Sequence, residues 1–182
     1  ALLNALVDLA GPDAVVTDPD LLAFHSQDMM TQGCVPLAMA SPASAAHLAA
    51  IVRLAGPAGI ALFPRGGGMS YSRAFTPDRT HALLIDFGRM AAVRQIDPVD
   101  GHVTVEAGCT WATLDSALAA HGVRTRFWGP MSGRTATVGG SLSIGSVTFG
   151  SGVVGASANA VKGFEIVTGT GAIVRTGSDG AG

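Results

Sequence analysis

Three consecutive glycines leave an apolar run that has the length of a β-strand. The run is Ile60–Phe63, and the segment after it, Pro64–Tyr71, reads PRGGGMSY. Glycines in such a loop free several backbone N–H groups to point at one spot, and a nest of this kind binds phosphate oxygens without a lysine. Arg65 would add positive charge and Ser70 a hydroxyl donor. The glycines alone fit a tight surface loop equally well, but their position after a strand favours an anion site.

A second segment of small polar residues surrounds a pair of glycines. It is Thr135–Ser143, which reads TATVGGSLS. Threonine and serine beside glycine can start a helix whose exposed N–H groups face a pyrophosphate, and small side chains let a flat ring lie against the backbone. A structural loop would explain these glycines, but not the presence of two separate Gly/Ser/Thr segments in one short chain.

Other chemical motifs fail on inspection. Gly150–Gly155 matches a dinucleotide fingerprint by its letters, but no clear strand precedes it and no acidic residue follows at about 20 positions. Lys162 is followed by Gly163 rather than Ser or Thr, so the phosphate-loop motif is absent. Gly140–Ser141 lacks the last glycine of a nucleophile elbow. The histidines and cysteines make no metal-ligand spacing, and we expect no metal site.

The composition narrows the class of protein. The 182 residues are 48% hydrophobic, which allows a sizeable core. Lys and Arg together number 11 against 13 Asp and Glu, giving a net charge of −2, which argues against nucleic-acid binding. No apolar run approaches the roughly 18–20 residues of a membrane helix. The only cysteines, Cys34 and Cys109, are too few for a disulfide framework, and cytoplasm is the default location.

The glycine content is unusually high. The chain has 25 glycines, whereas average usage would give about 13. Residues 129–182 hold more than half of them. Glycine is favoured where the backbone takes a positive φ or where another group approaches closely, so this gradient needs a functional or structural reason.

The first half of the chain has the pattern of a helical cover followed by a βαβ unit. Leucines at helical spacing run from Leu2 to Leu9, and Asp18 can cap a short helix that reaches Phe24. Val35–Ala40 and the 60–63 run are expected as parallel strands around a helix that Ser41 and Pro42 cap and Gly56 ends. A further strand is expected over residues 82–87.

The second half has the pattern of hairpins. Apolar alternation around residues 98–101 predicts an antiparallel hairpin, and residues 161–168 and 172–176 predict another. Between them, Thr110 can cap a helix that carries Trp111, Leu114 and Leu118 on one face. These patterns predict an α+β fold of two lobes with a break near 88–92. We expect an N-terminal helical cover over 1–34, a first subdomain over 35–90 and a second over 91–182.

Four segments, taken in order and spacing, resemble the FAD-binding module of the vanillyl-alcohol oxidase/p-cresol methylhydroxylase (PCMH-type) flavoproteins. They are Pro64–Tyr71, Glu106–Leu114, Thr135–Ser143 and Phe164–Ala172, and the resemblance covers roughly residues 35–178. It implies two α+β subdomains, a small βαβ lobe and a lobe of mainly antiparallel strands, with FAD extended between them. The agreement of four ordered motifs is more specific than any single glycine loop.

The resemblance also assigns roles to residues. It implies that the loop from Arg65 to Ser70 wraps the diphosphate and that Tyr71 extends this loop. Trp111 and Leu114, by contrast, are expected to be core residues of the supporting helix. The residues it assigns to the cofactor are Arg65, Gly66, Gly67, Gly68, Met69, Ser70, Tyr71, Ser132, Gly133, Thr137, Val138, Gly139, Gly140, Ser143 and Ile144.

Two departures from the family pattern bear on chemistry. Many members carry a histidine at the place of Met69 that is covalently bound to the flavin, and some add a cysteine near the place of Gly133. This chain has neither, so we expect noncovalent FAD. Cys109 lies away from both places and is expected to be a small packed residue.

Members of the family continue with a last FAD-contacting segment and a substrate-binding cap domain, which supplies most catalytic side chains. We therefore expect this chain to be an N-terminal portion that is inactive alone, and no catalytic residue can be named in it. The expected function is oxidation of a small alcohol, hydroxy acid or amine through the flavin, with electrons passed to oxygen or another acceptor. The alternatives are a flavin- or nucleotide-binding subunit without turnover, and a glycine-rich scaffold without a ligand.

Overall fold

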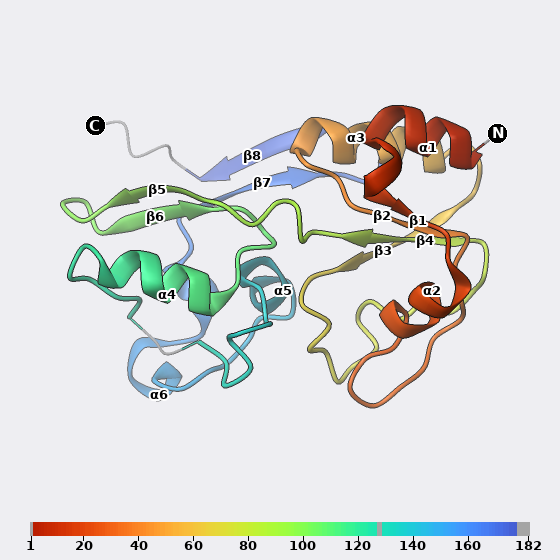
Figure 1. Ribbon diagram of the computed structural model, residues 1–182. Helices are drawn as coiled ribbons and strands as arrows, with labels where there is room; N and C mark the ends of the chain where they lie inside the picture. Colours follow the sequence, from red (N-terminus) through yellow and green to blue (C-terminus); the bar gives the residue numbers. More distant parts are fainter. Residues whose placement is uncertain (1, 127–128, 178–182) are drawn as a thin grey trace. The chain divides into compact units, whose positions relative to one another are not determined.

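The structure is a computed structural model that describes residues 2–126 and 129–177 (Figure 1). The chain divides into two compact units. The first unit is discontinuous: it contains the residues up to Arg89 and those from Lys162 onward. The second unit is Met90–Val161. This division differs from the expected one in two respects. The expected cover over 1–34 and the subdomain over 35–90 fall in one unit, and the segment after residue 161 groups with that first unit rather than with the second.

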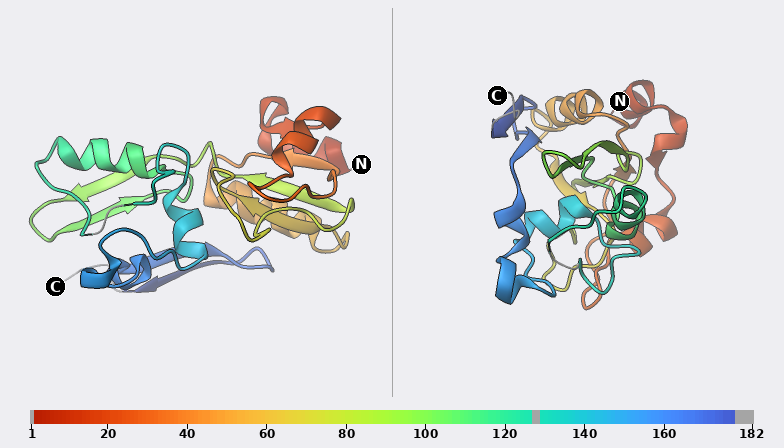
Figure 2. Two further views of the ribbon diagram at one scale, coloured as in Figure 1. Left: turned by 90° about the horizontal axis from the view of Figure 1, so that it is seen from below. Right: turned by 90° about the vertical axis from the view of Figure 1, so that its left-hand side faces the viewer.

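A four-stranded sheet organises the first unit (Figure 1, Figure 2). Its strands are β1 (Val15–Val16), β2 (Ala38–Ala40), β3 (Ala61–Arg65) and β4 (Ala82–Asp86), in the order β1-β2-β4-β3. Both β2 and β3 pair with β4 in parallel, whereas β1 pairs with β2 antiparallel. The predicted βαβ unit is confirmed, with β4 inserted between its two strands. Central β4 is buried along most of its length, as expected for a continuous apolar run in a parallel sheet.

Three α-helices cover the two faces of this sheet. Figure 1 shows α1 (Leu2–Ala10) and α3 (Ala45–Ala55) on one side and α2 (Pro19–His25) on the other. As predicted, Asp18 caps α2, because its Oδ1 accepts the N–H groups of Asp20 and Leu21. The predicted cap of α3 is wrong by one turn.

The residue that caps α3 is Ser44, not Ser41. The Ser44 hydroxyl accepts the His47 N–H at 3.2 Å, which is the N-cap to N3 bond. Ser41 instead remains beside the end of β2, where its N–H donates to the Ala14 carbonyl. The prediction from sequence placed the cap at Ser41 and did not consider Ser44.

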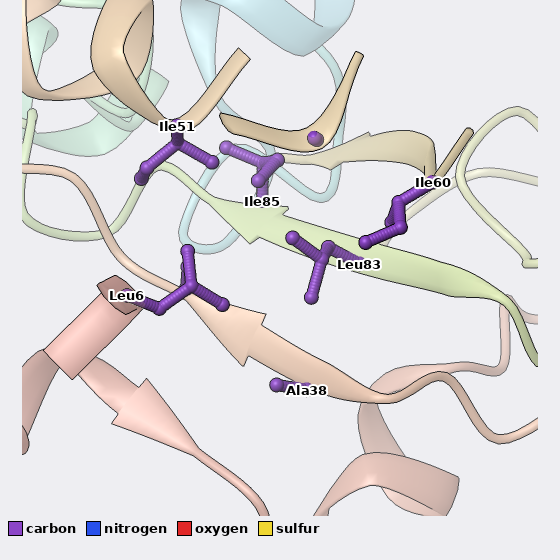
Figure 3. Close-up of a cluster of buried hydrophobic side chains, with 8 residues drawn as sticks. Leu6, Ala38, Ile51, Ile60, Leu83 and Ile85 are labelled. Atoms are coloured by element: carbon purple, nitrogen blue, oxygen red, sulfur yellow. The ribbon is translucent and has the colours of Figure 1, made fainter. Parts of the chain in front are cut away.

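The core follows the twofold alternation of β4. Leu83 and Ile85 pack with Leu6 of α1 and Ile51 of α3, and Figure 3 shows these side chains gathered together. Leu84 points to the other face, into a cluster with Leu22 and Met39. Successive strand residues face opposite sides of a sheet, so this one strand anchors both helical layers. The sheet is therefore a rigid base for the loop that leaves β3.

A hairpin joins this unit from the other end of the chain. It consists of β7 (Gly163–Val167) and β8 (Ile173–Gly177), which pair antiparallel as predicted. At its turn, Arg53 Nη2 of α3 donates to the Gly171 carbonyl at 2.8 Å. This contact explains why the hairpin belongs to the first unit, and no local sequence pattern could show it.

The second unit starts with the other predicted hairpin, β5 (Val93–Asp97) and β6 (His102–Val105). The predicted helix follows as α4 (Trp111–Ala119), with Thr110 as its N-cap and with Trp111, Leu114 and Leu118 buried. Short helices complete the unit. They are α5 (Val138–Ser143), α6 (Ser151–Val154) and the 3₁₀ segment Ser157–Ala160. The first unit also contains a 3₁₀ segment, Pro12–Ala14. None of the described helices has the length and apolar character needed to cross a bilayer.

Candidate functional site

The loop after β3 carries a run of unused backbone donors. In the described part of the chain, none of the N–H groups of residues 66–71 donates a hydrogen bond to a protein acceptor. The glycines Gly66–Gly68 are half-buried rather than fully exposed. Consecutive backbone donors that no protein acceptor uses can form an anion-binding nest. The loop therefore has the donors that the sequence predicted.

Gly68 shapes this loop in a way that other residues cannot. Its φ is +74°, in the left-handed region, and a Cβ added to it would lie 2.6 Å from Nη2 of Arg65. A side chain at this position would meet both backbone strain and the guanidinium. The last glycine of the triplet thus lets Arg65 lie directly against the loop.

Arg65 lies under the loop instead of reaching into solvent. Its Nη1 donates to Asp86 Oδ1 and to the Gly66 carbonyl, both at 3.3 Å. Its guanidinium lies 5.5 Å from the centre of the Phe75 ring, and only 14% of its side chain is exposed. Its Nε is buried without a partner. The structure therefore gives Arg65 a bracing position, with its charge placed beneath the row of N–H groups and balanced by Asp86.

The structure adds His25, which the sequence analysis did not identify. Burial lowers the pKa of His25 below its ordinary value, and the Arg65 charge lowers it further, while Asp86 acts in the opposite direction. Its Nδ1 is buried and has no partner. The ring is therefore neutral at pH 7 beside an Arg–Asp pair. In the sequence it is only the last residue of α2, so no local signal pointed to this role.

The remaining residues of the loop divide into a structural and an exposed part. The Ser70 hydroxyl oxygen accepts the Ser72 N–H at 3.1 Å, and the Ser70 carbonyl accepts the Met29 N–H at 3.1 Å. Tyr71 is 67% exposed. Ser70 thus holds the turn through its two oxygen atoms, and the expected role of its O–H as a donor to the anion stays a prediction.

The second glycine segment is organised differently from the prediction. Thr137 caps α5, and its Oγ1 accepts the Gly140 N–H at 3.1 Å. The Val138 N–H donates to the Cys109 carbonyl and the Gly139 N–H to the Ala107 carbonyl. These three N–H groups already donate to protein acceptors. The prediction that they are exposed and face a pyrophosphate is therefore wrong. The cause is a long-range bridge between Thr110 and Thr137, which the sequence did not reveal.

Close packing inside the protein explains two glycines of this segment. A Cβ on Gly139 would lie 2.7 Å from the Cβ and carbonyl oxygen of Ala107. A Cβ on Gly133 would lie 3.0 Å from the Pro130 carbonyl oxygen and 3.2 Å from Cβ of Trp111. Both glycines therefore admit neighbouring protein atoms, a reason that does not require a flavin.

The other predicted contacts in the second unit are accessible side chains. Ser132 is half-buried, and its carbonyl accepts the N–H groups of Thr135 and Ala136. Ser143 donates its hydroxyl to the Gly139 carbonyl at 2.8 Å. Ile144 is 58% exposed. The structure brings residues 65–71 together in the first unit and residues 132–144 together in the second.

Helix α4, which contacts the Thr135–Ser143 segment, buries the side chains predicted to be in the core. Trp111 is buried, and its indole Nε1 donates to the Ser141 hydroxyl at 2.8 Å. Cys109 is fully buried, and burial, followed by the charge of Glu106, raises the pKa of its thiol. Both results agree with the predicted packing roles.

The tip of the β5–β6 hairpin gathers three side chains that could ligate a metal. Asp97, Asp100 and His102 place one ligand atom each within 4.8 Å of one another. Asp97 Oδ1 also accepts the N–H groups of Val99 and Asp100. This carboxylate closes the turn, so its position has a structural explanation that needs no metal ion.

Comparison with known proteins agrees with this geometry. The family model described as "FAD binding domain" matches residues 36–177. An uncharacterized FAD-linked oxidoreductase of Mycobacterium tuberculosis is 30% identical over 154 residues, which are 84% of this chain and 33% of that protein. A D-2-hydroxyglutarate dehydrogenase of Stutzerimonas stutzeri is 28% identical over 185 residues, covering 98% of this chain and 38% of its own length.

Solved structures confirm the predicted fold. An alkyldihydroxyacetonephosphate synthase superposes over 100% of this chain and 35% of its own with a TM-score of 0.88 and 23% identity. A p-cresol methylhydroxylase with substrate bound gives a TM-score of 0.83 at 19% identity, over 99% of this chain and 36% of its own. The chain thus spans about a third of the length of the proteins it matches.

Proposed function

This chain belongs to the FAD binding domain family of FAD-linked oxidoreductases, and we propose that it holds the FAD of an enzyme that oxidises a small alcohol, hydroxy acid or amine. The observation that carries the proposal is the row of unpaired N–H groups over residues 66–71. A diphosphate offers the oxygens that would satisfy several of these donors at once. The other residues that would contact FAD are those named from the family pattern in both units.

The donor set fits a dinucleotide for a second reason. Arg65 lies beneath the loop with its charge paired to Asp86, so the positive field at the nest is moderate. Backbone N–H groups then provide most of the recognition, and they impose a fixed geometry that a diphosphate matches better than a single carboxylate.

Bound FAD supplies hydride acceptance, and the protein supplies its binding, orientation and electrostatic surroundings. Residues 66–71 of this chain would fix the diphosphate, and the Arg65–Asp86 pair would brace the loop from below. We assign no general base within this chain. The residues that contact the substrate would come from a further domain, as the one-third coverage of the relatives' length supports.

The flavin is proposed to be noncovalent. Met69 stands where many family members have the histidine that attaches to the flavin, and a thioether has no N–H nucleophile for such a bond. Acid or heat precipitation of the purified full-length protein should leave the yellow flavin in the supernatant. Flavin retained by the washed pellet would contradict a noncovalent cofactor.

The substrate class is proposed from the relatives. One relative is a D-2-hydroxyglutarate dehydrogenase and another is a xylooligosaccharide oxidase of Thermothelomyces thermophilus, and both names denote substrates that carry hydroxyl groups. These names support an alcohol or hydroxy acid over an amine. A cytoplasmic location is proposed from the two free cysteines, Cys34 and Cys109, which suit a reducing compartment.

Anaerobic reduction of the bound flavin tests the proposed reaction. We expect the visible flavin absorption of the full-length protein to bleach on addition of a hydroxy acid or alcohol, and an amine series serves as the comparison. Bleaching by dithionite but by none of these classes would favour a flavin-binding subunit without turnover. That result would contradict the proposed activity while leaving FAD binding intact.

A further inference from the structure

A segment outside the matched family region holds the anion-binding loop in place. The family match begins at residue 36, but the preceding residues 26–34 are hydrogen-bonded to the loop that follows β3. The Met29 N–H donates to the Ser70 carbonyl, and the Cys34 N–H donates to the Pro77 carbonyl at 2.8 Å. These bonds tie both ends of the region around residues 70–77 to the N-terminal segment.

Asp28 is the centre of this connection. Asp28 is only 8% exposed, and both of its carboxylate oxygens accept backbone N–H groups. Oδ1 accepts from Met30 at 2.9 Å and from Thr31 at 2.7 Å. Oδ2 accepts from Arg73 at 2.7 Å, across 45 positions of sequence. One carboxylate therefore organises its own turn and reaches into the other loop.

Arg73 is an independent sign that the loop is held in a set shape. It is the residue other than glycine with a positive φ, +60°, in the described part of the chain. A side chain in the left-handed region is unfavourable and persists only where surrounding contacts fix it. The bond to Asp28 is such a contact, and Arg73 lies two residues beyond the end of the donor run at Tyr71.

We propose that Asp28 is a positioning residue that presets the 66–71 loop for the diphosphate of the cofactor. The proposal rests on the proposed function of this loop. Asp28 does not touch the ligand; it fixes Arg73 and, through the adjoining Met29 bond, the Ser70 carbonyl. A loop that is ordered before binding loses less conformational freedom when the ligand arrives, so its affinity is higher.

The chemistry of the site favours a carboxylate in this role. The three donors are backbone N–H groups, and a carboxylate can accept all three through two oxygens. An asparagine would keep one oxygen for the local turn and present an N–H₂ group elsewhere. Asp28→Asn therefore preserves size and most of the local turn but cannot serve both loops.

The test compares ligands with and without a diphosphate. In the full-length protein freed of flavin, Asp28→Ala and Asp28→Asn are measured by calorimetry against FAD, ADP and riboflavin. Losing a hydrogen bond to a charged group predicts about tenfold weaker binding of FAD and ADP. Riboflavin has no phosphate, so its affinity should stay within about twofold of wild type, a change of a few tenths of a kcal/mol.

Asp18→Ala is the matched control. Asp18 also accepts two backbone N–H groups in the N-terminal segment, but these cap α2, and among the described residues it makes no hydrogen bond to the 66–71 loop or to Arg73. It should lower thermal stability without changing the ratio of ADP to riboflavin affinity. Should the control and the Asp28 variants shift that ratio equally, or should the Asp28 variants bind ADP like wild type, the positioning role is overturned.

The outcomes separate this proposal from the proposed function. A wild-type protein that binds neither FAD nor ADP would overturn both. Normal FAD and ADP binding by wild type together with unchanged binding by folded Asp28→Asn would overturn only the role of Asp28. Equal weakening of ADP and riboflavin would also overturn it, because that pattern indicates a general structural defect.

Discussion

Gly68 meets two structural requirements of the candidate site, a left-handed backbone and the absence of a side chain. Its left-handed backbone gives the loop its turn, and its missing side chain leaves room for the Arg65 guanidinium. Gly59 also has a positive φ, +65°, but an added Cβ there would have nothing within 4 Å. The two positions share backbone strain and differ in their surroundings.

Gly68→Ala should therefore damage ligand binding as well as stability. Forcing a side chain into the left-handed region costs about 1–3 kcal/mol, and displacement of Arg65 adds to it. We expect FAD affinity to fall by about tenfold or more, which corresponds to about 1.4 kcal/mol. Titration of the flavin-free protein with FAD measures the change.

Gly59→Ala is the control for that prediction. It should lower the thermal unfolding temperature through backbone strain, but leave FAD affinity near that of wild type. Equal effects of both variants on FAD affinity would contradict a specific role for Gly68 in the loop.

The ionisation of Asp28 predicts a dependence of stability on pH. The Met30 N–H has the largest effect on the pKa of Asp28 and lowers it, and burial comes second and raises it. The N–H groups of Arg73 and Thr31 and the Arg73 charge lower it further, so the pKa lies below its ordinary value. A carboxyl whose pKa is lower in the folded than in the unfolded state stabilises the fold above the unfolded pKa, and this contribution is lost as pH falls through the folded pKa.

Wild type should therefore lose stability below about pH 4 more steeply than Asp28→Ala. Chemical unfolding at a series of pH values measures the difference between the two proteins. A constant difference across the acidic range would show that the Asp28 carboxyl does not titrate with folding.

At the scale of elements, the second unit depends on the contact between α4 and α5. Trp111 of α4 and Ser141 of α5 form a buried hydrogen bond, and both ends are inaccessible to water. Ser143 lies on the same short helix but is exposed and bonds to the backbone of its own helix.

Ser141→Ala should cost about 1–3 kcal/mol of unfolding free energy, because the Trp111 indole N–H loses its acceptor in a buried place. Ser143→Ala should change the unfolding free energy by no more than about 0.5 kcal/mol. Denaturant unfolding followed by tryptophan fluorescence measures both. Similar effects from the two variants would argue against a stabilising Trp111–Ser141 bond.

Elements whose signals are local could be predicted from the sequence. The Asp18 cap, the hairpin around residues 98–101 and the buried face of α4 each depend on residues a few positions apart, and each is confirmed. The start of α3 was misplaced by three residues, because Ser41 before Pro42 has the residue types of a helix start although Ser44 is the cap. Local patterns therefore predicted the elements well and some of their boundaries less well.

The candidate site was predictable only in part for the same reason. The donor loop could be recognised because its glycines are adjacent in sequence. Contacts between distant segments could not: the bridge from Thr110 to Thr137 uses the donors expected to face an anion, and Asp28 reaches Arg73 across 45 positions. Glycine content has a comparable ambiguity, since Gly139 is explained by its close approach to Ala107.

At the scale of the whole molecule, the chain consists of two compact units and spans about a third of the length of its relatives. The family membership covers residues 36–177, and the N-terminal segment before it contributes Asp28 and His25 to the surroundings of the donor loop. The structural support of the donor loop therefore extends beyond the family match.

Flavin content is the measurement that tests the central claim most directly. The full-length protein is purified, its visible spectrum is recorded, and the small molecules released by acid are identified by chromatography and mass. We predict one FAD per chain, released without covalent attachment and restored to the flavin-free protein by added FAD. A folded protein that contains no flavin and binds no added FAD would contradict the account.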